Sequence, residues 1–185
     1  MKRGKKITKK YKILVFIGIV ILVIGVGVGV ALGLNKLFGE RSSNSGGSEQ
    51  QATDGGIVDF QNQILKSEAN GNRKETEAII KEAKKSAKSA NDNVQLTEAY
   101  MLEASTAYNN GDYQKAISAA EEALTVSDNS RKASIYQFLA FSYQELNDNA
   151  KALDNVNRAI EVLDKNIIDY DIVLRELNNM KAKLE

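Results

Sequence analysis

The sequence predicts an all-α protein with an N-terminal transmembrane helix, a flexible linker, and a solenoid of about three antiparallel helix-turn-helix units that ends in a capping helix. Three observations support this prediction. A long apolar run occupies residues 13–34, a Gly/Ser-rich tract follows it, and the rest combines an internal repeat with apolar residues spaced three and four apart. That spacing places apolar side chains on one face of a helix, and no stretch alternates for long with the period of two that a strand requires.

The composition narrows the classes of function. The chain of 185 residues contains no Cys, His, Trp or Pro. Without Cys or His there is no disulfide, thiol nucleophile or usual zinc site, so we expect no enzyme activity, metal or cofactor. Residues 1–12 hold seven of the 25 basic residues and no acid, which leaves 18 basic against 24 acidic residues afterwards, a net charge of −6. A mildly acidic body with a basic tip is not typical of a nucleic-acid-binding protein.

The apolar run ILVFIGIVILVIGVGVGVALGL, residues 13–34, has no charged side chain. As a helix it is about 33 Å long, which matches the hydrocarbon thickness of a bilayer. An uncleaved membrane anchor is therefore predicted, and a cleaved signal peptide is the alternative, although its apolar region is normally shorter. Because the basic tip precedes the span, the positive-inside rule predicts a single-pass cell-membrane protein with a cytoplasmic N-terminus and an extracytoplasmic body.

Small residues share one face of the predicted span. They are Gly18, Gly25, Gly29 and Gly33. Such a ladder lets two membrane helices pack closely, which predicts a homodimer through the span. Glycine used as filler in a Val/Ile-rich helix is the alternative interpretation.

Residues 35–56 form the predicted linker. Its Gly/Ser-rich part, RSSNSGGSEQQATDGG at residues 41–56, lacks apolar periodicity. As a flexible chain it reaches on the order of 20–25 Å, so the body is expected to work at a short distance from the bilayer.

The body repeats itself at an offset of 36 residues. The stretch NNGDYQKAISAAEEAL, residues 109–124, aligns with ELNDNAKALDNVNRAI, residues 145–160. Small residues coincide in this alignment, since Ala104, Ala116 and Ala123 meet Ala140, Ala152 and Ala159. Two antiparallel helices pack closely only where the side chains between them are small. This pattern resembles the tetratricopeptide repeat, a helix-turn-helix unit of about 34 residues, and we assign repeats to residues 97–132 and 133–168.

A weaker third copy, residues 57–96, appears at an offset of 40. Here Thr76 replaces one of the alanines, and the bulky Ile64 stands where Ala104 predicts a small residue. In the better repeats, Glu103 stands where the family usually has Leu, and Asn147 replaces the turn glycine. Residues 169–185 carry one apolar stripe and many charges, as expected of a helix that covers the last open face of a stack.

The run KEAKKSAKSA at residues 81–90 is rich in lysine. We interpret it as a solvated helix face, and contact with lipid headgroups is the alternative.

The resemblance implies a concave surface, lined by the first helix of each unit, that binds a peptide or helix of a partner protein. The candidate groove residues lie on the two best-preserved first helices. They are Met101, Ser105, Tyr108, Asn109, Gln137, Phe141, Gln144 and Glu145. The family's clamp for C-terminal carboxylates needs Lys and Asn where this chain has Met101 and Ser105, so binding of chaperone tails is not expected.

These features predict a membrane-anchored adaptor or scaffold for protein–protein interaction, with a protein or peptide partner and the lipid bilayer as its contacts. By family analogy such a protein serves envelope assembly or secretion in a bacterium. One alternative is a structural component that oligomerises through its Gly-rich span. Another is a receptor on an organelle membrane with its repeats in the cytosol.

Overall fold

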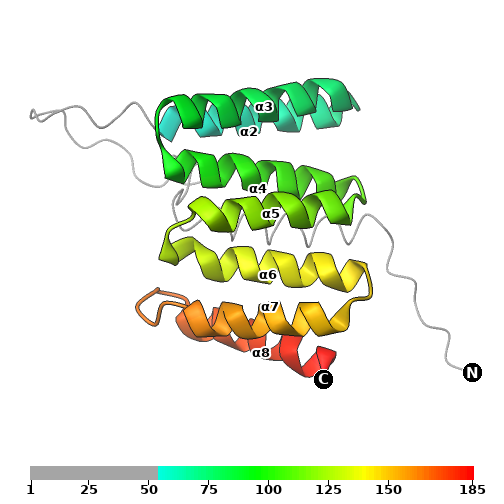
Figure 1. Cartoon of the computed structure of the whole chain (residues 1–185), viewed down its shortest axis with the longest axis vertical. Coiled ribbons are helices and arrows are strands. Elements are labelled where there is room, and N and C mark those ends of the chain that lie inside the picture. The colour runs from blue at the N-terminus through cyan, green and yellow to red at the C-terminus, as the bar shows by residue number, and fades with distance from the viewer. Residues whose placement is uncertain (1–53) are drawn as a thin grey trace, which may run out of the picture. The chain divides into compact units, whose positions relative to one another are not determined.

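A computed structural model of the protein describes residues 54–185, which form seven helices and no strand. The helices, labelled in Figure 1, are α2 (Asp54–Ala69), α3 (Arg73–Ser89), α4 (Asn93–Asn109), α5 (Tyr113–Val126), α6 (Asn129–Glu145), α7 (Asn149–Val162) and α8 (Tyr170–Leu184). Consecutive helices pack as antiparallel pairs, α2 with α3, α4 with α5 and α6 with α7, and α8 packs against α7. The described part of the chain is therefore all-α and has the order of elements expected of a helical solenoid.

The two central pairs follow the 36-residue offset closely. Helices α4 and α6 each have 17 residues, and α5 and α7 each have 14. The first helices begin at Asn93 and Asn129, four residues before the repeat boundaries assigned from the sequence. The helix lengths explain why the alignment holds over the whole unit.

The turn within each pair requires a residue with positive φ. Gly71 and Gly111 adopt φ values of 68° and 79°, and Asn147 takes the same conformation at 58°. Asn populates the left-handed region more readily than most residues, which explains how it replaces glycine in the third pair. In each turn the N–H that follows this residue closes the end of the first helix, as when Asp112 donates to the carbonyl of Ala107 at 2.9 Å.

Each second helix, and two of the first helices, begin at a side chain that caps the helix N-terminus. Asn72, Asp92, Asp112, Asp128 and Asp148 each accept a hydrogen bond from the backbone N–H three residues later. These side chains satisfy N–H groups that have no partner within the helix. The Asn/Asp-rich turns of the sequence therefore place the starts of the helices.

Alanines fill the contacts between paired helices, as predicted. Six alanines of the two central pairs have no exposed surface: Ala104, Ala116, Ala123, Ala140, Ala152 and Ala159. Their burial confirms that they are packing residues rather than ligand contacts.

The first pair, α2 and α3, accommodates its departures from the pattern. Ile64 is 4% exposed and packs in a cluster with Ile57, Ile80 and Ala83. Helix α3 has 17 residues, three more than α5, so most of the extra length of this repeat lies in its second helix.

Helix α8 closes the described stack. Leu177 and Met180 are 1% and 8% exposed and join a cluster with Val156 and Ala159 of α7. Because the apolar stripe of α8 covers α7, the last pair is not left with an open apolar face.

The predicted anchor at residues 13–34 and its glycine ladder lie outside the described residues, as do the basic tip and most of the linker. Within residues 54–185, no helix is both long and apolar enough to cross a bilayer.

Candidate protein-binding groove

The first helices α4 and α6 run parallel and are connected at both ends by polar contacts. Both begin after a capping aspartate, Asp92 or Asp128, and are separated in sequence by the second helix α5. The contacts at their two ends differ in chemistry, and together they fix the spacing of the candidate groove.

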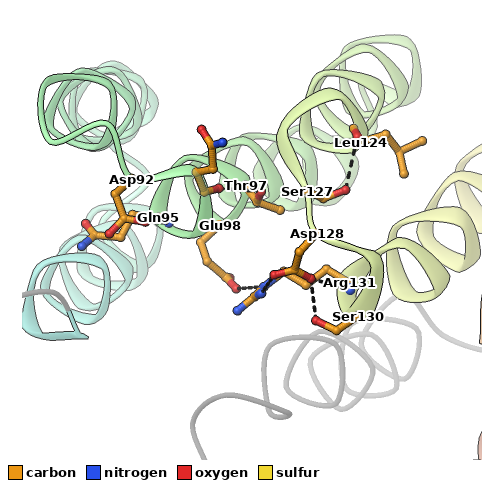
Figure 2. Close-up of polar contacts among 10 residues, drawn as sticks. Asp92, Gln95, Thr97, Glu98, Leu124, Ser127, Asp128, Ser130 and Arg131 are labelled. Atoms are coloured by element: carbon orange, nitrogen blue, oxygen red, sulfur yellow. Dashed lines mark hydrogen bonds and ion pairs between the residues drawn. The ribbon is translucent and has the colours of Figure 1, made fainter. Parts of the chain in front are cut away.

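At the N-terminal end, Glu98 of α4 pairs with Arg131 of α6. The distance from Glu98 Oε1 to Arg131 Nε is 3.4 Å, and Arg131 also pairs with Asp128 (Figure 2). The Ser130 hydroxyl donates to Asp128 at 2.5 Å, and this bond is the main reason why the pKa of the Asp128 carboxyl is lowered. Burial raises the pKa of Glu98, and the charge of Arg131 opposes that shift. This end of the groove is thus a small ionic network with one cation between two carboxylates.

At the C-terminal end, Glu145 of α6 accepts from two tyrosines. The hydroxyls of Tyr108 and Tyr113 each lie 3.3 Å from a different oxygen of Glu145. The Tyr108 ring also packs edge-on against Tyr113, with centroids 5.1 Å apart, and lies 5.8 Å from Phe138. Burial, and then the charge of Glu145, raises the pKa of Tyr108, so its hydroxyl stays protonated and serves as a donor. This end therefore combines aromatic packing with a bonded carboxylate.

The structure brings together two of the residues predicted for the groove, Tyr108 and Glu145, through a direct hydrogen bond. The others lie in register along the two helices. Ser105, Gln137, Phe141 and Gln144 are half-buried, Asn109 is exposed, and Met101 is 8% exposed. Met101 therefore offers little surface, whereas the remaining side chains present a mixed polar and aromatic face.

Three further residues belong to this region but were not identified from the sequence. Tyr113 and Phe138 contact Tyr108, as described above. Leu65 of α2 stands 40 residues before Ser105 and is 64% exposed. Leu65 could have been predicted from the 40-residue offset of the weak third copy, because it corresponds to Ser105. The contacts of Tyr113 and Phe138 could not, because they depend on how the helices pack.

The departure from the family pattern at Glu103 has a structural reason. Its carboxylate pairs with Lys84 of α3 at 2.5 Å and with Lys115 of α5 at 3.9 Å, and Lys115 also reaches Glu77 at 3.8 Å. An acidic residue here links three consecutive helices in place of an apolar contact. No group of three acidic side chains in residues 54–185 is placed to hold a metal ion.

Antiparallel pairs with buried alanines, left-handed turns and parallel first helices define a helical-repeat module. Residues 95–165, which include most of α4 and all of α5, α6 and α7, match the family model described as tetratricopeptide repeat. Neither the curated proteins nor the solved structures gave a match. The matched region has the sequence pattern and the arrangement of helices of that family, whose repeats generally mediate protein–protein interaction.

Proposed function

We propose that this protein is a membrane-anchored adaptor that binds a segment of a partner protein on the face formed by α4 and α6 and continued by α2. The observation that carries the proposal is the connected α4–α6 face within the region that matches tetratricopeptide repeats. The mechanism is binding rather than catalysis.

The chemistry of the face suits a polypeptide. Tyr108 and Phe141, both half-buried, supply aromatic surface, and Phe141 also packs against the core cluster that α6, α7 and α8 share. Amide donors and acceptors come from Asn109, Gln137 and Gln144. Aromatic side chains contribute strongly to the affinity of protein interfaces, and amides can pair with the backbone of a bound segment. Because contacts at both ends hold α4 and α6 together, little ordering of the groove is required when a partner binds.

The location of the adaptor is proposed from the sequence. The apolar run at residues 13–34, preceded by seven basic residues, supports a single-pass anchor with the repeats on the extracytoplasmic side. Attachment to the bilayer raises the local concentration of the groove near membrane-bound partners. Assistance to envelope assembly or secretion is the role that this layout favours.

Capture of partners with and without the groove aromatics tests the proposal. The full chain in detergent serves as bait, together with the Tyr108→Ala/Phe141→Ala variant. We expect this variant to lose at least about tenfold in partner affinity, because buried aromatic contacts contribute about 2 kcal/mol or more at interface centres. A second variant, Gln137→Lys/Gln144→Lys, changes the same face while leaving its aromatic packing in place.

The matched control removes apolar surface elsewhere. Ile168 is fully exposed and Ile172 is 47% exposed, and neither lies on α4 or α6. The Ile168→Ala/Ile172→Ala variant should retain the partners of the unmodified chain. If all four baits capture the same proteins with equal affinity, the α4–α6 face is not the binding site.

A further inference from the structure

Helix α3 has a basic face that the proposed groove does not use. Its sequence, RKETEAIIKEAKKSAKS, contains six basic and three acidic residues. The remaining described residues hold 10 basic and 19 acidic side chains. Positive charge is therefore concentrated on one helix of an otherwise acidic body.

The helical period gathers these cations on one side of α3. With 3.6 residues per turn, its basic side chains fall within about one third of the helix circumference. They are Arg73, Lys74, Lys81, Lys84, Lys85 and Lys88. The buried residues Thr76, Ile80, Ala83 and Ala87 form a separate stripe that packs into the stack. Burial of this stripe fixes the rotation of the helix, so the basic side chains other than Lys84, which pairs with Glu103 of α4, face the solvent.

The acidic residues of α3 neutralise only part of this face. Glu82 pairs with Lys85 at 3.7 Å, and Glu77 pairs with Arg73 at 3.6 Å and with Lys115 of α5 at 3.8 Å. Lys74, Lys81 and Lys88 have no acidic partner on α3 among the ion pairs of the described residues. Four lysines on the arc remain exposed to solvent: Lys74, Lys81, Lys85 and Lys88. The ammonium of Lys88 also lies 5.9 Å from the centre of the Tyr100 ring, a cation–π contact that favours one position for its side chain.

The basic face ends beside the point where the linker enters the body. Helices α2 and α3 are antiparallel, so the last turns of α3 lie next to the start of α2 (Figure 1). A side chain at Gly56, in the first turn of α2, would lie 3.5 Å from Gln95, which stands just after the connection from α3 to α4. Lys85 and Lys88 are therefore at the end of the body to which the tether attaches.

We infer that the basic face of α3 docks on the anionic phospholipid surface of the membrane to which the chain is anchored. The inference rests on the proposed anchor, and docking through α3 would hold the tethered body in one orientation at the membrane. Exposed lysines on a body tethered near the bilayer are attracted to anionic headgroups, whereas the acidic remainder of the body is repelled by them. The basic face lies on α3 and the proposed groove on α4 and α6, so docking through α3 uses none of the groove residues.

Energy transfer in nanodiscs tests this inference with the full chain. Because the chain has no cysteine, Ser89→Cys at the end of α3 provides a single site for a donor fluorophore. The discs contain phosphatidylcholine alone or mixed with phosphatidylglycerol, and they carry an acceptor on the headgroups. We expect higher transfer in the anionic discs and a decrease as salt screens the attraction.

Two triple variants that each remove three positive charges distinguish an effect of the α3 lysines from an effect of the net charge of the chain. Lys81→Gln/Lys85→Gln/Lys88→Gln should decrease the docked population in anionic discs about tenfold or more. Lys165→Gln/Arg175→Gln/Lys183→Gln, at exposed positions after α7 and on α8, should leave it unchanged. An equal helical circular dichroism spectrum shows that each variant is folded.

Each other result overturns the inference in a distinct way. Equal transfer in both kinds of disc, or equal losses for the two triple variants, excludes docking through α3. Loss of captured proteins from the α3 variant without any lipid dependence would assign the face to an acidic protein partner instead. A chain that does not incorporate into the discs contradicts the anchor, while capture by the α4–α6 face can still be measured in solution.

Discussion

The helix pairs α2–α3 and α4–α5 pack in the same way, but different side chains occupy two of their equivalent buried positions. Ala107 and Ala116 lie 4% and 0% exposed in the second pair, and the equivalent positions of the first pair hold Ser67 and Thr76, each 1% exposed. The two hydroxyls lie 2.8 Å apart, and Ser67 also reaches the carbonyl of Asn72 at 2.8 Å. Both positions hold small side chains in these two pairs, and the first pair shows that polar side chains are tolerated there when each polar atom has a partner.

Changing the size of the side chain at the equivalent positions Ile64 and Ala104 should have the largest effect on the free energy of unfolding. Ile64 and Ala104 occupy equivalent positions, with exposures of 4% and 0%. Ile64→Ala leaves a cavity in the first pair and should lower the free energy of unfolding by about 2–4 kcal/mol. Ala104→Leu overpacks the second pair and should lower it by about 1–3 kcal/mol. Urea denaturation followed by circular dichroism measures both.

The control for this exchange is Leu65→Ala, since Leu65 is 64% exposed and should change the free energy of unfolding by less than about 0.5 kcal/mol. If Ala104→Leu is as stable as the unmodified chain, the second pair has room that the contacts of Ala104 do not indicate.

Breaking the hydroxyl pair should have an intermediate effect. Thr76→Val removes one hydroxyl and leaves the Ser67 hydroxyl with fewer partners, which should cost about 1–2 kcal/mol. The double variant Ser67→Ala/Thr76→Val converts the site toward the apolar chemistry of the second pair, so it should cost less than the sum of the two single changes. A double-mutant cycle from urea denaturation gives the coupling, and purely additive losses would show that the hydroxyls do not depend on each other.

The sequence was sufficient for the features that recur. The 36-residue offset predicted helix pairs of equal length, and the coincidence of small residues predicted the buried alanines at Ala116 and Ala152. These features follow from local patterns, because each repeat must pack against a similar neighbour.

Contacts that occur in only one repeat could not be predicted from the sequence pattern. The pairing of Glu98 with Arg131 has no counterpart in the next unit, since the uncharged Ser134 stands 36 residues after Glu98. The bonds from Tyr108 and Tyr113 to Glu145 also join residues that no periodicity relates. The groove was therefore predicted as a set of positions along two helices, while the contacts that connect them depend on the tertiary structure.

Acid should destabilise the start of α7 more than the start of α3, because their capping side chains differ. We expect this effect on stability to be smaller than those of the two predictions above. Asn72 caps α3 with an amide oxygen that does not titrate, 3.3 Å from the N–H of Glu75, and its amide N–H donates to the Glu75 carboxylate at 2.8 Å. Asp148 caps α7 with a carboxylate, and the N–H of Lys151 that it accepts holds its pKa below the ordinary value of 3.8. Because the native pKa is lower than that of the unfolded chain, the stabilisation is present above pH 3.8 and is lost as the pH falls through the native pKa.

Hydrogen exchange at the starts of α3 and α7 measures this difference. Acidification should reduce protection of the Lys151 amide more than that of the Glu75 amide, because the oxygen of Asn72 that accepts from Glu75 N–H does not titrate. Asp148→Asn should make the start of α7 insensitive to acid, and Asn72→Asp should make the start of α3 sensitive. If Asp148→Asn leaves the acid response of α7 unchanged, other carboxylates cause it. The reciprocal exchange identifies the cap, rather than the stack around it, as the origin of the difference, because both helices follow a left-handed turn of the same kind.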